Sequence, residues 1–247
     1  MYISRERKES SIKGTGIQYI PGHDENFVDF VIENYLPESG NILDLGGGGL
    51  RFAIPVALKG KTVTVVDIDI ESLDVTNIIE RVNKNEKMKL KLQSVKGFIQ
   101  TRLQNMFDFL DETDNNYSFV SAFRVIHFLS PDMLSKFLCL VHRNLDLNGI
   151  FVLSAITPYN FLNVNEFNEI YLNSTPITEN ILYRKFNSTL EAKNIKKQQN
   201  LPDYLHLIDN KFVDSLSKRH GFEVIESGLQ STRIVGGYIL RKSSDYL

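Results

Sequence analysis

A run of four glycines between an apolar segment and a segment with helical spacing limits the fold of this chain most strongly. The run occupies positions 46–49, after Asn41-Ile-Leu-Asp-Leu45 and before Arg51. Glycine permits positive φ and lets a ligand approach the backbone, and a helix that follows presents unpaired N–H groups at its start. The pattern predicts a strand, a ligand-binding turn and a helix. A tight turn that binds nothing is the alternative.

Short β-branched runs alternate with longer stretches of helical spacing along the chain. The predicted strands are 41–45, 62–67, 97–103, 117–123, 149–156, 222–227 and 233–241. The predicted helices are 25–35, 51–58, 70–85, 105–110, 131–145 and 209–220. This alternation predicts an α/β fold in which helices cover both faces of a mostly parallel, seven-stranded sheet. The last two strands are separated by a connection too short for a parallel crossover, so the last strand is expected to be antiparallel.

Residues 157–207 break this alternation, because they hold nine asparagines and the prolines 158, 176 and 202. We interpret them as a lid inserted after the fifth strand, at the edge of the sheet where ligands bind in open α/β folds. The chain is then expected to form one domain. Its parts are an N-terminal arm and helix (1–40), a core (41–156), the lid (157–207), and a last helix with an antiparallel strand pair (208–247).

Charge and hydropathy narrow the class of partner. The chain has 28 basic and 30 acidic residues, a net charge of −2, which disfavours a nucleic-acid partner. No stretch is long and apolar enough to span a membrane, and residues 1–11 are charged where a signal peptide would be apolar. We therefore expect a cytoplasmic protein without a membrane partner. Cys139 is the single cysteine and the five histidines lack ligand spacing, so no metal site is expected.

Asp44 decides which ligand the glycine turn suits. A carboxylate two residues before Gly46 would repel a pyrophosphate, but it can hold the cationic methionine part of S-adenosylmethionine. The dinucleotide pattern G-x-G-x-x-G also fails, since its third glycine would fall at Arg51 or Phe52. These observations favour S-adenosylmethionine over a dinucleotide.

A second acid follows the next predicted strand, 21 residues beyond Gly46. Asp67 stands at the end of Val65-Val-Asp67-Ile-Asp69, where a carboxylate can accept hydrogen bonds from both hydroxyls of a ribose. Asp69 is the rival for this role, although a helix N-cap explains it equally well.

At this point the chain resembles the class I S-adenosylmethionine-dependent methyltransferases, which have a Rossmann-like fold. Their loop reads roughly (D/E)-x-G-x-G-x-G, matched here by Asp44, Gly46 and Gly48, with Leu50 in place of the third glycine. The resemblance implies S-adenosylmethionine as methyl donor and S-adenosylhomocysteine as product. The donor-binding residues that it implies are Asp44, Gly46, Gly47, Gly48, Asp67, Ile68, Asn105, Met106 and Phe123.

The resemblance also assigns roles around the third and fourth strands. Asn105 is expected to hydrogen-bond the adenine amino group and Met106 to turn its backbone N–H toward the ring, with a turn-forming Asn105 as the alternative. Phe123 and Arg124 are expected to pass under the donor. His127 is a candidate general base, because the pKa of histidine suits neutral pH; simple packing of this residue is the alternative.

The implied reaction is an in-line displacement at the sulfonium methyl group, with a small molecule as acceptor. The aromatic residues of the lid favour an enclosed site, and no Asn-Pro-Pro-Tyr or Asp-Pro-Pro-Tyr stretch follows the fourth strand. Candidate acceptor contacts are Tyr19, His23, His127 and Tyr159. The lysine run from Lys84 to Lys91 leaves an RNA or protein methyltransferase as an alternative, and Leu50 and Asn105 leave a non-catalytic donor-binding or partner-binding module.

Overall fold

The computed structural model of the chain describes residues 25–76, 93–158, 183–185, 204–229 and 235–243. Three of the predicted acceptor contacts, Tyr19, His23 and Tyr159, lie outside these residues, as does the lysine run from Lys84 to Lys91.

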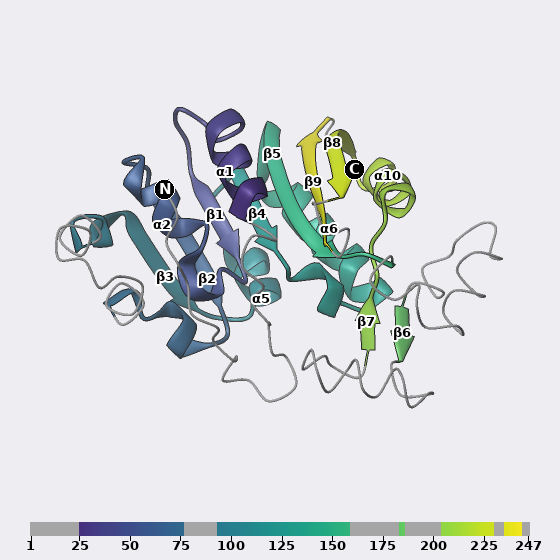
Figure 1. The fold of residues 1–247 in the computed structure, drawn as a ribbon, viewed down its shortest axis with the longest axis horizontal. Coiled ribbons are helices and arrows are strands. Elements are labelled where there is room, and N and C mark those ends of the chain that lie inside the picture. The colour runs from purple at the N-terminus through teal and green to yellow at the C-terminus, as the bar shows by residue number, and fades with distance from the viewer. Residues whose placement is uncertain (1–24, 77–92, 159–182, 186–203, 230–234, 244–247) are drawn as a thin grey trace.

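The core is a seven-stranded sheet with the order β3-β2-β1-β4-β5-β9-β8 (Figure 1). Its strands are β1 (Ile42–Leu45), β2 (Val63–Asp67), β3 (Ile99–Leu103), β4 (Tyr117–Phe123), β5 (Leu145–Ile156), β8 (Phe222–Leu229) and β9 (Val235–Lys242). The first five strands are parallel, and β9 runs antiparallel to both β5 and β8. The predicted fold class and the antiparallel last strand are therefore confirmed.

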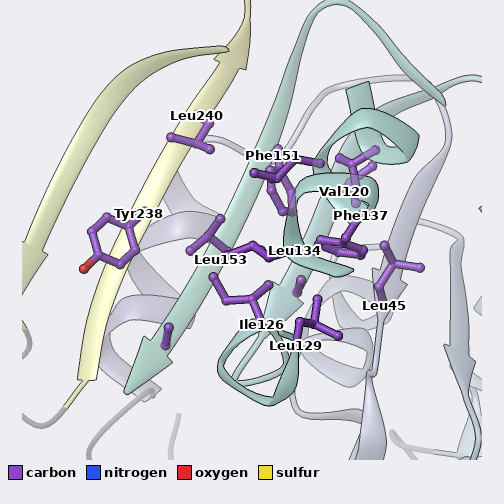
Figure 2. Packing of buried hydrophobic residues seen from close by; sticks show 14 of the residues in the cluster. Leu45, Val120, Ile126, Leu129, Leu134, Phe137, Phe151, Leu153, Tyr238 and Leu240 are labelled. Carbon is purple, nitrogen blue, oxygen red and sulfur yellow. The ribbon is translucent and has the colours of Figure 1, made fainter. Parts of the chain in front are cut away.

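Helices cover both faces of the sheet, each over its own apolar cluster. The helices α1 (Glu25–Asn34) and α2 (Ala53–Leu58) pack on one face. The helices α5 (Met106–Glu112), α6 (Pro131–Asn144) and α10 (Asn210–Arg219) pack on the other. Figure 2 shows Leu134 and Phe137 of α6 against Phe151 of β5 on this second face. Because both faces are covered, the central strands are almost wholly apolar.

Two boundaries differ from the prediction. β5 begins at Leu145, directly after α6, because Leu145 already pairs with Tyr117 of β4 before an irregularity in the register. Instead of starting a regular helix, residues 70–73 form the 3₁₀ turn η2 (Ile70–Leu73). Asp69 caps this turn, since its side chain accepts from the backbone N–H of Glu71.

The described part of residues 157–207 returns to the carboxyl end of the sheet. Two short strands, β6 (Tyr183–Lys185) and β7 (Tyr204–His206), pair antiparallel. Of these, β7 packs against the 3₁₀ turn η4 (Ile126–Phe128) that follows β4. The N–H of Ile208 then donates to the carbonyl of Ile156 at 2.9 Å. Figure 1 shows both strands beyond the end of β5, and a covering role for the whole segment stays a prediction.

None of the described helices is long and apolar enough to cross a membrane.

Candidate functional site

The glycine turn lies at the carboxyl end of β1 and leads into the 3₁₀ turn η1 (Gly48–Leu50). Gly46 has a φ of 64°, and its N–H donates to the carbonyl of Val66 on β2 at 2.8 Å. A Cβ at Gly46 would lie 2.4 Å from Cγ2 of Val125, the second residue after β4. Both the backbone conformation and the close approach of Val125 therefore require glycine at the first position of the turn.

Leu50 occupies the position of the third glycine in the loop pattern. It keeps a positive φ of 55°, which is rare for a residue other than glycine. Its side chain is fully buried in the apolar cluster under α1 and α2, together with Ile42 and Val65. The leucine thus keeps the backbone path of the turn and places its side chain in the core.

Asp44 lies beneath the glycine turn, with 2% of its surface exposed. Its Oδ1 accepts a hydrogen bond from Oγ of Ser121 on β4 at 2.7 Å. Its Oδ2 lies 2.4 Å from the position that a Cβ would take on Gly47, so the turn and the carboxyl group are in direct contact. Burial raises the pKa of Asp44 to about 7, against the lowering effect of the Ser121 hydrogen bond, and the charge of Asp67 raises it further.

Asp67 reaches the same turn from the end of β2. Its Oδ2 would lie 3.0 Å from a Cβ on Gly48, and its Oδ1 accepts from the N–H of Asp69 at 2.9 Å. Burial raises the pKa of Asp67, while backbone N–H groups, including that of Gly48, oppose the shift. Asp69 instead caps η2, accepting from the N–H of Glu71 and, at 2.7 Å, from Oγ of Ser72. The structure therefore brings Asp44 and Asp67 together at the glycine turn and gives Asp69 a capping role.

Apolar side chains stand exposed next to these acids. Ile68 is 60% exposed at the end of β2, and Leu103 is 56% exposed at the end of the neighbouring β3. Ile70, in η2, is exposed as well. Exposed aliphatic groups beside a polar turn suit a flat, apolar ring such as adenine. Sequence reasoning named Ile68 but missed Leu103 and Ile70, although an apolar residue that follows the polar centre of β3 was a usable signal.

Asn105 and Met106 stand at the start of α5, as expected from their position after β3. The Oδ1 of Asn105 accepts from the N–H of Phe107 at 2.8 Å, which makes Asn105 the N-cap of the helix. This is the turn-forming alternative. A carbonyl oxygen has a second lone pair, so the cap leaves room for one more donor. Met106 is the first helical residue, where backbone N–H groups have no partner within the helix.

The end of β4 carries the residues predicted to lie under the donor. Phe123 is half-buried and its ring meets those of Phe27 and Phe52 at centroid distances of 6.1 and 5.5 Å. Arg124 follows with a positive φ of 59°, and its N–H donates to both the carbonyl and the Oγ of Ser154, at 2.9 and 3.2 Å. Arg124 is 8% exposed, so a guanidinium group is buried at the carboxyl end of the sheet.

His127 lies in η4 and is 1% exposed. Burial holds the pKa of His127 well below its usual range, and the charge of Arg124 lowers it further. The imidazole is therefore neutral at pH 7 but a weak base, which differs from the expectation that its pKa suits neutral pH. A second buried histidine, His206, lies in β7, which packs against η4.

Comparison with known proteins agrees with this geometry. Residues 43–153 match the family model described as a methyltransferase domain. A SAM-dependent methyltransferase from Methanosarcina mazei is similar, with 18% identity, 87% of this chain and 98% of the other covered, and a TM-score of 0.56. No curated protein sequence matches the chain significantly.

Two further similar structures contain S-adenosylhomocysteine, the product that remains after S-adenosylmethionine has given up its methyl group. The magnesium protoporphyrin IX methyltransferase of Synechocystis with bound SAH is 16% identical, with 90% of this chain and 84% of the other covered and a TM-score of 0.55. The glycopeptide N-methyltransferase MtfA, complexed with S-adenosyl-L-homocysteine, is 15% identical, with 90% and 91% covered and a TM-score of 0.58.

The family match and the fold confirm the resemblance that the glycine turn and its acids predicted. Residues 43–153 match a methyltransferase domain, and the fold is the one seen in S-adenosylmethionine-dependent methyltransferases. The methyl donor of this class is S-adenosylmethionine, as predicted.

Proposed function

We propose that this chain transfers the sulfonium methyl group of S-adenosylmethionine to a small-molecule acceptor in the cytoplasm. The observation that carries the proposal is the placement of two carboxyl groups, Asp44 and Asp67, against successive glycines of one turn. Burial and the charge of Asp67 both raise the energy of ionising Asp44, so a bound cation would relieve the repulsion between the two carboxylates. The donor is such a cation, since it carries a sulfonium and an ammonium group.

In this proposal each donor-binding residue contacts one part of S-adenosylmethionine. Asp44 holds the methionine part, directly or through water, and the backbone from Gly46 to Gly48 follows the donor closely. Asp67 accepts from the ribose hydroxyls. Ile68 packs on the adenine, and the N–H of Met106 and the side chain of Asn105 meet its polar edge. Phe123 lies under the donor at the end of β4.

The methyl transfer needs little chemical activation by the protein, because the sulfonium sulfur is already a strong leaving group. The nucleophile of the acceptor attacks the methyl carbon as the carbon–sulfur bond breaks, leaving S-adenosylhomocysteine. The protein contributes alignment and exclusion of water. For an acceptor that must lose a proton, His127 is the candidate base; burial lowers its pKa, so it would take up that proton only weakly.

A small acceptor is supported by two of the similar structures, whose names give magnesium protoporphyrin IX and a glycopeptide as acceptors. The alternatives are an RNA or protein methyltransferase and a non-catalytic donor-binding or partner-binding module.

Calorimetric titration of the purified protein tests the donor first, with S-adenosylmethionine and S-adenosylhomocysteine as ligands and NAD as control. We expect micromolar binding of the first two and none of NAD. Asp44→Ala should abolish binding, while Asp114→Asn, at an exposed position, should leave it intact. Unchanged binding by Asp44→Ala would contradict the assigned site. A screen of metabolites for methyl transfer, with total RNA and protein extract beside them, then tests the class of acceptor.

A further inference from the structure

Asp44 has a hydroxyl group beside it on the neighbouring strand. Asp44 of β1 and Ser121 of β4 are register partners in the parallel sheet, so their side chains lie side by side on one face. The Oγ of Ser121 lies 2.7 Å from Oδ1 of Asp44, and both residues are buried. The same Oγ lies 3.3 Å from the carbonyl oxygen of Leu43. The Ser121 hydroxyl therefore lies within reach of two different oxygen atoms of β1.

A hydroxyl group has a single hydrogen, so it donates to one of these two oxygens at a time. When Asp44 is neutral, its carboxyl O–H donates to Oγ of Ser121, and the serine hydrogen donates to the carbonyl of Leu43. When Asp44 is ionised, the serine hydrogen turns to Oδ1. The separation of 2.7 Å suits either arrangement. Ser121 can thus pair with both protonation states of a carboxyl group that is buried.

The other surroundings of Asp44 favour its neutral form in the empty chain. An apolar valine of β2 is its second register partner, and Gly47 lies above it. Asp67 of β2 is the charged side chain whose field reaches it, and its like charge opposes ionisation. No charged residue occurs in β4, η1 or α2, and Asp29 and Glu33 of α1 are exposed. Burial raises the pKa of Asp44 to about 7, so most of the empty chains hold this proton at pH 6.

We propose that Ser121 is a positioning residue, whose hydroxyl turns its hydrogen from Leu43 to Asp44 when Asp44 gives up a proton and binds the cationic methyl donor. This inference rests on the proposed function, because it concerns how Asp44 recognises S-adenosylmethionine at the same site. In this step the O–H bond of Asp44 breaks, the proton passes to the solvent, and the carboxylate pairs with the cation. Below neutral pH, each molecule that binds therefore releases one proton.

Calorimetry of the full chain with S-adenosylhomocysteine measures this proton. The titration at pH 6 is repeated in MES and in phosphate, two buffers with different ionisation enthalpies, and the difference in heat gives the number of protons released. We expect about one proton per ligand, and an affinity that rises about tenfold from pH 5 to pH 6. The α-amino group of the ligand, with a usual pKa of about 8, stays charged in this range.

Two substitutions show which acid releases the proton. Asp44→Asn binds more weakly, and its remaining affinity should be the same at pH 5 and pH 6. Asp67→Asn should still release a proton at pH 5, although it also binds more weakly. Infrared difference spectra of the native chain give a check that needs no variant, because binding at pH 6 should remove the C=O band of a carboxylic acid and add a carboxylate band. Proton release that persists in Asp44→Asn would overturn the inference.

Ser121→Ala tests the hydroxyl group itself. The hydrogen bond from Ser121 lowers the pKa of Asp44, so without it ionisation needs a higher pH. Relative to the native chain at the same pH, the variant should bind S-adenosylhomocysteine about tenfold more weakly at pH 6, but less than about threefold more weakly at pH 8.5. Titration of the ligand's amino group cancels in this ratio. An equal loss at both pH values would identify a purely structural serine and overturn the role of Ser121.

Ser118→Ala is the matched control, because Ser118 also lies in β4 and its Oγ donates to a backbone carbonyl, that of Asn41, at 3.1 Å. It should change neither affinity nor proton release. Melting temperatures show whether Ser121→Ala is folded. If it is not, Ser121→Cys keeps the size of the side chain with weaker hydrogen bonding, and its loss of affinity should again be larger at pH 6 than at pH 8.5.

The native chain separates the inference from the proposed function. Failure to bind S-adenosylhomocysteine at any pH between 5 and 8.5 would count against the proposed function itself. Binding at pH 6 without release of a proton would overturn this inference alone and leave the donor site in place.

Discussion

The donor side of the site and its acceptor side are built in opposite ways. The donor side, made of Asp44, the turn from Gly46 to Gly48, and Asp67, lies within one strand–turn–helix–strand unit of the chain, and its titrating groups are acids. The second part, which we call the acceptor side, combines the buried residues Arg124, His127 and His206 from β4, η4 and β7, and its ionisable side chains are bases. If the proposed roles hold, the contrast teaches that the donor is bound by a local stretch of sequence, whereas the acceptor depends on tertiary packing.

The largest effect is expected from Asp44→Asn. The carboxamide keeps the shape of the side chain but cannot ionise, so affinity for S-adenosylhomocysteine should fall at least about 100-fold, as for loss of a buried charge pair. The unfolding free energy at pH 8 should instead rise, by roughly 1–4 kcal/mol, because the native carboxylate is ionised there against burial. Calorimetry and urea denaturation measure the two quantities.

Asp114→Asn supplies the control for that pair of measurements, since it removes a carboxylate that is exposed. It should leave both binding and stability unchanged. A destabilised Asp44→Asn protein that still bound the donor product would reverse our description of the donor side, making Asp44 a structural residue.

Gly47→Ala is expected to have the next largest effect. Its Cβ would lie 2.4 Å from Oδ2 of Asp44 and 2.5 Å from Cγ1 of Val65, and both neighbours are buried. Overpacking of this kind costs roughly 1–3 kcal/mol and should move the Asp44 carboxyl group. We expect a lower melting temperature and weaker binding of S-adenosylhomocysteine.

The matched control for Gly47 is Gly97, in the 3₁₀ turn η3 (Lys96–Phe98), where a Cβ would meet nothing within 4 Å. Gly97→Ala should change the unfolding free energy by less than about 0.5 kcal/mol. Equal effects of the two substitutions would show that the contact between Gly47 and Asp44 does not shape the site.

The donor side was predictable because its evidence is local. The apolar strand before the glycines, the acid two residues earlier and the acid at the end of the next strand can each be recognised in a short window of sequence. The strand rhythm and the short last connection likewise sufficed for the sheet and its antiparallel strand. Leu50 was harder, since only the structure shows that its side chain turns into the core while its φ stays positive.

The acceptor side was less predictable for the opposite reason. Arg124 was expected near the donor, but no feature of the neighbouring sequence indicates that it is buried or that its φ is positive. His206 depends on the return of β7 over η4, after a long segment without a clear pattern. Asn105 shows a third limit, because one residue type serves as a cap and as a ligand, and the sequence does not separate the two roles.

A smaller difference should separate the two acids that the sequence left as rivals. Asp67→Asn keeps one oxygen that can accept from the N–H of Asp69. Its NH₂ group, however, is a donor facing the ribose hydroxyls, which need an acceptor, so affinity for S-adenosylhomocysteine should fall about tenfold. Asp69→Asn can still cap η2 and should bind almost normally. Asp69→Ala should lower stability by about 1 kcal/mol, the usual cost of a lost cap, with little change in binding. If calorimetry showed a larger loss of S-adenosylhomocysteine affinity for Asp69→Asn than for Asp67→Asn, Asp69 would be the ribose ligand instead of Asp67.

The smallest net effect in the native chain is the dependence of stability on pH, because Asp44 and His206 contribute to it with opposite signs. The pKa of Asp44 is raised from 3.8 to about 7, so the folded chain holds a proton that the unfolded chain has released, and this contribution to stability is lost as pH rises from about 4 to about 7. The pKa of His206 is lowered from 6.5 to about 4, so the unfolded chain takes a proton first, and this contribution is lost as pH falls from about 6.5 to about 4. At about 1.4 kcal/mol per pKa unit, the two amount to roughly 4 and 3 kcal/mol and nearly cancel.

Replacing either Asp44 or His206 should reveal the pH dependence that the other contributes. Relative to the native chain, Asp44→Asn should become progressively less stable on acidification from pH 7 to pH 4, because it lacks the stability that the native chain gains as Asp44 takes up its proton. His206→Asn keeps a hydrogen-bond donor but does not titrate in this range, and it should become relatively more stable over the same interval. Urea denaturation followed by circular dichroism at pH 4, 5.5 and 7 gives both trends. If the relative stabilities of the two variants changed in the same direction on acidification, the contrast between an acidic donor side and a basic acceptor side would be wrong. That contrast requires protonation to stabilise the fold at Asp44 and to destabilise it at His206.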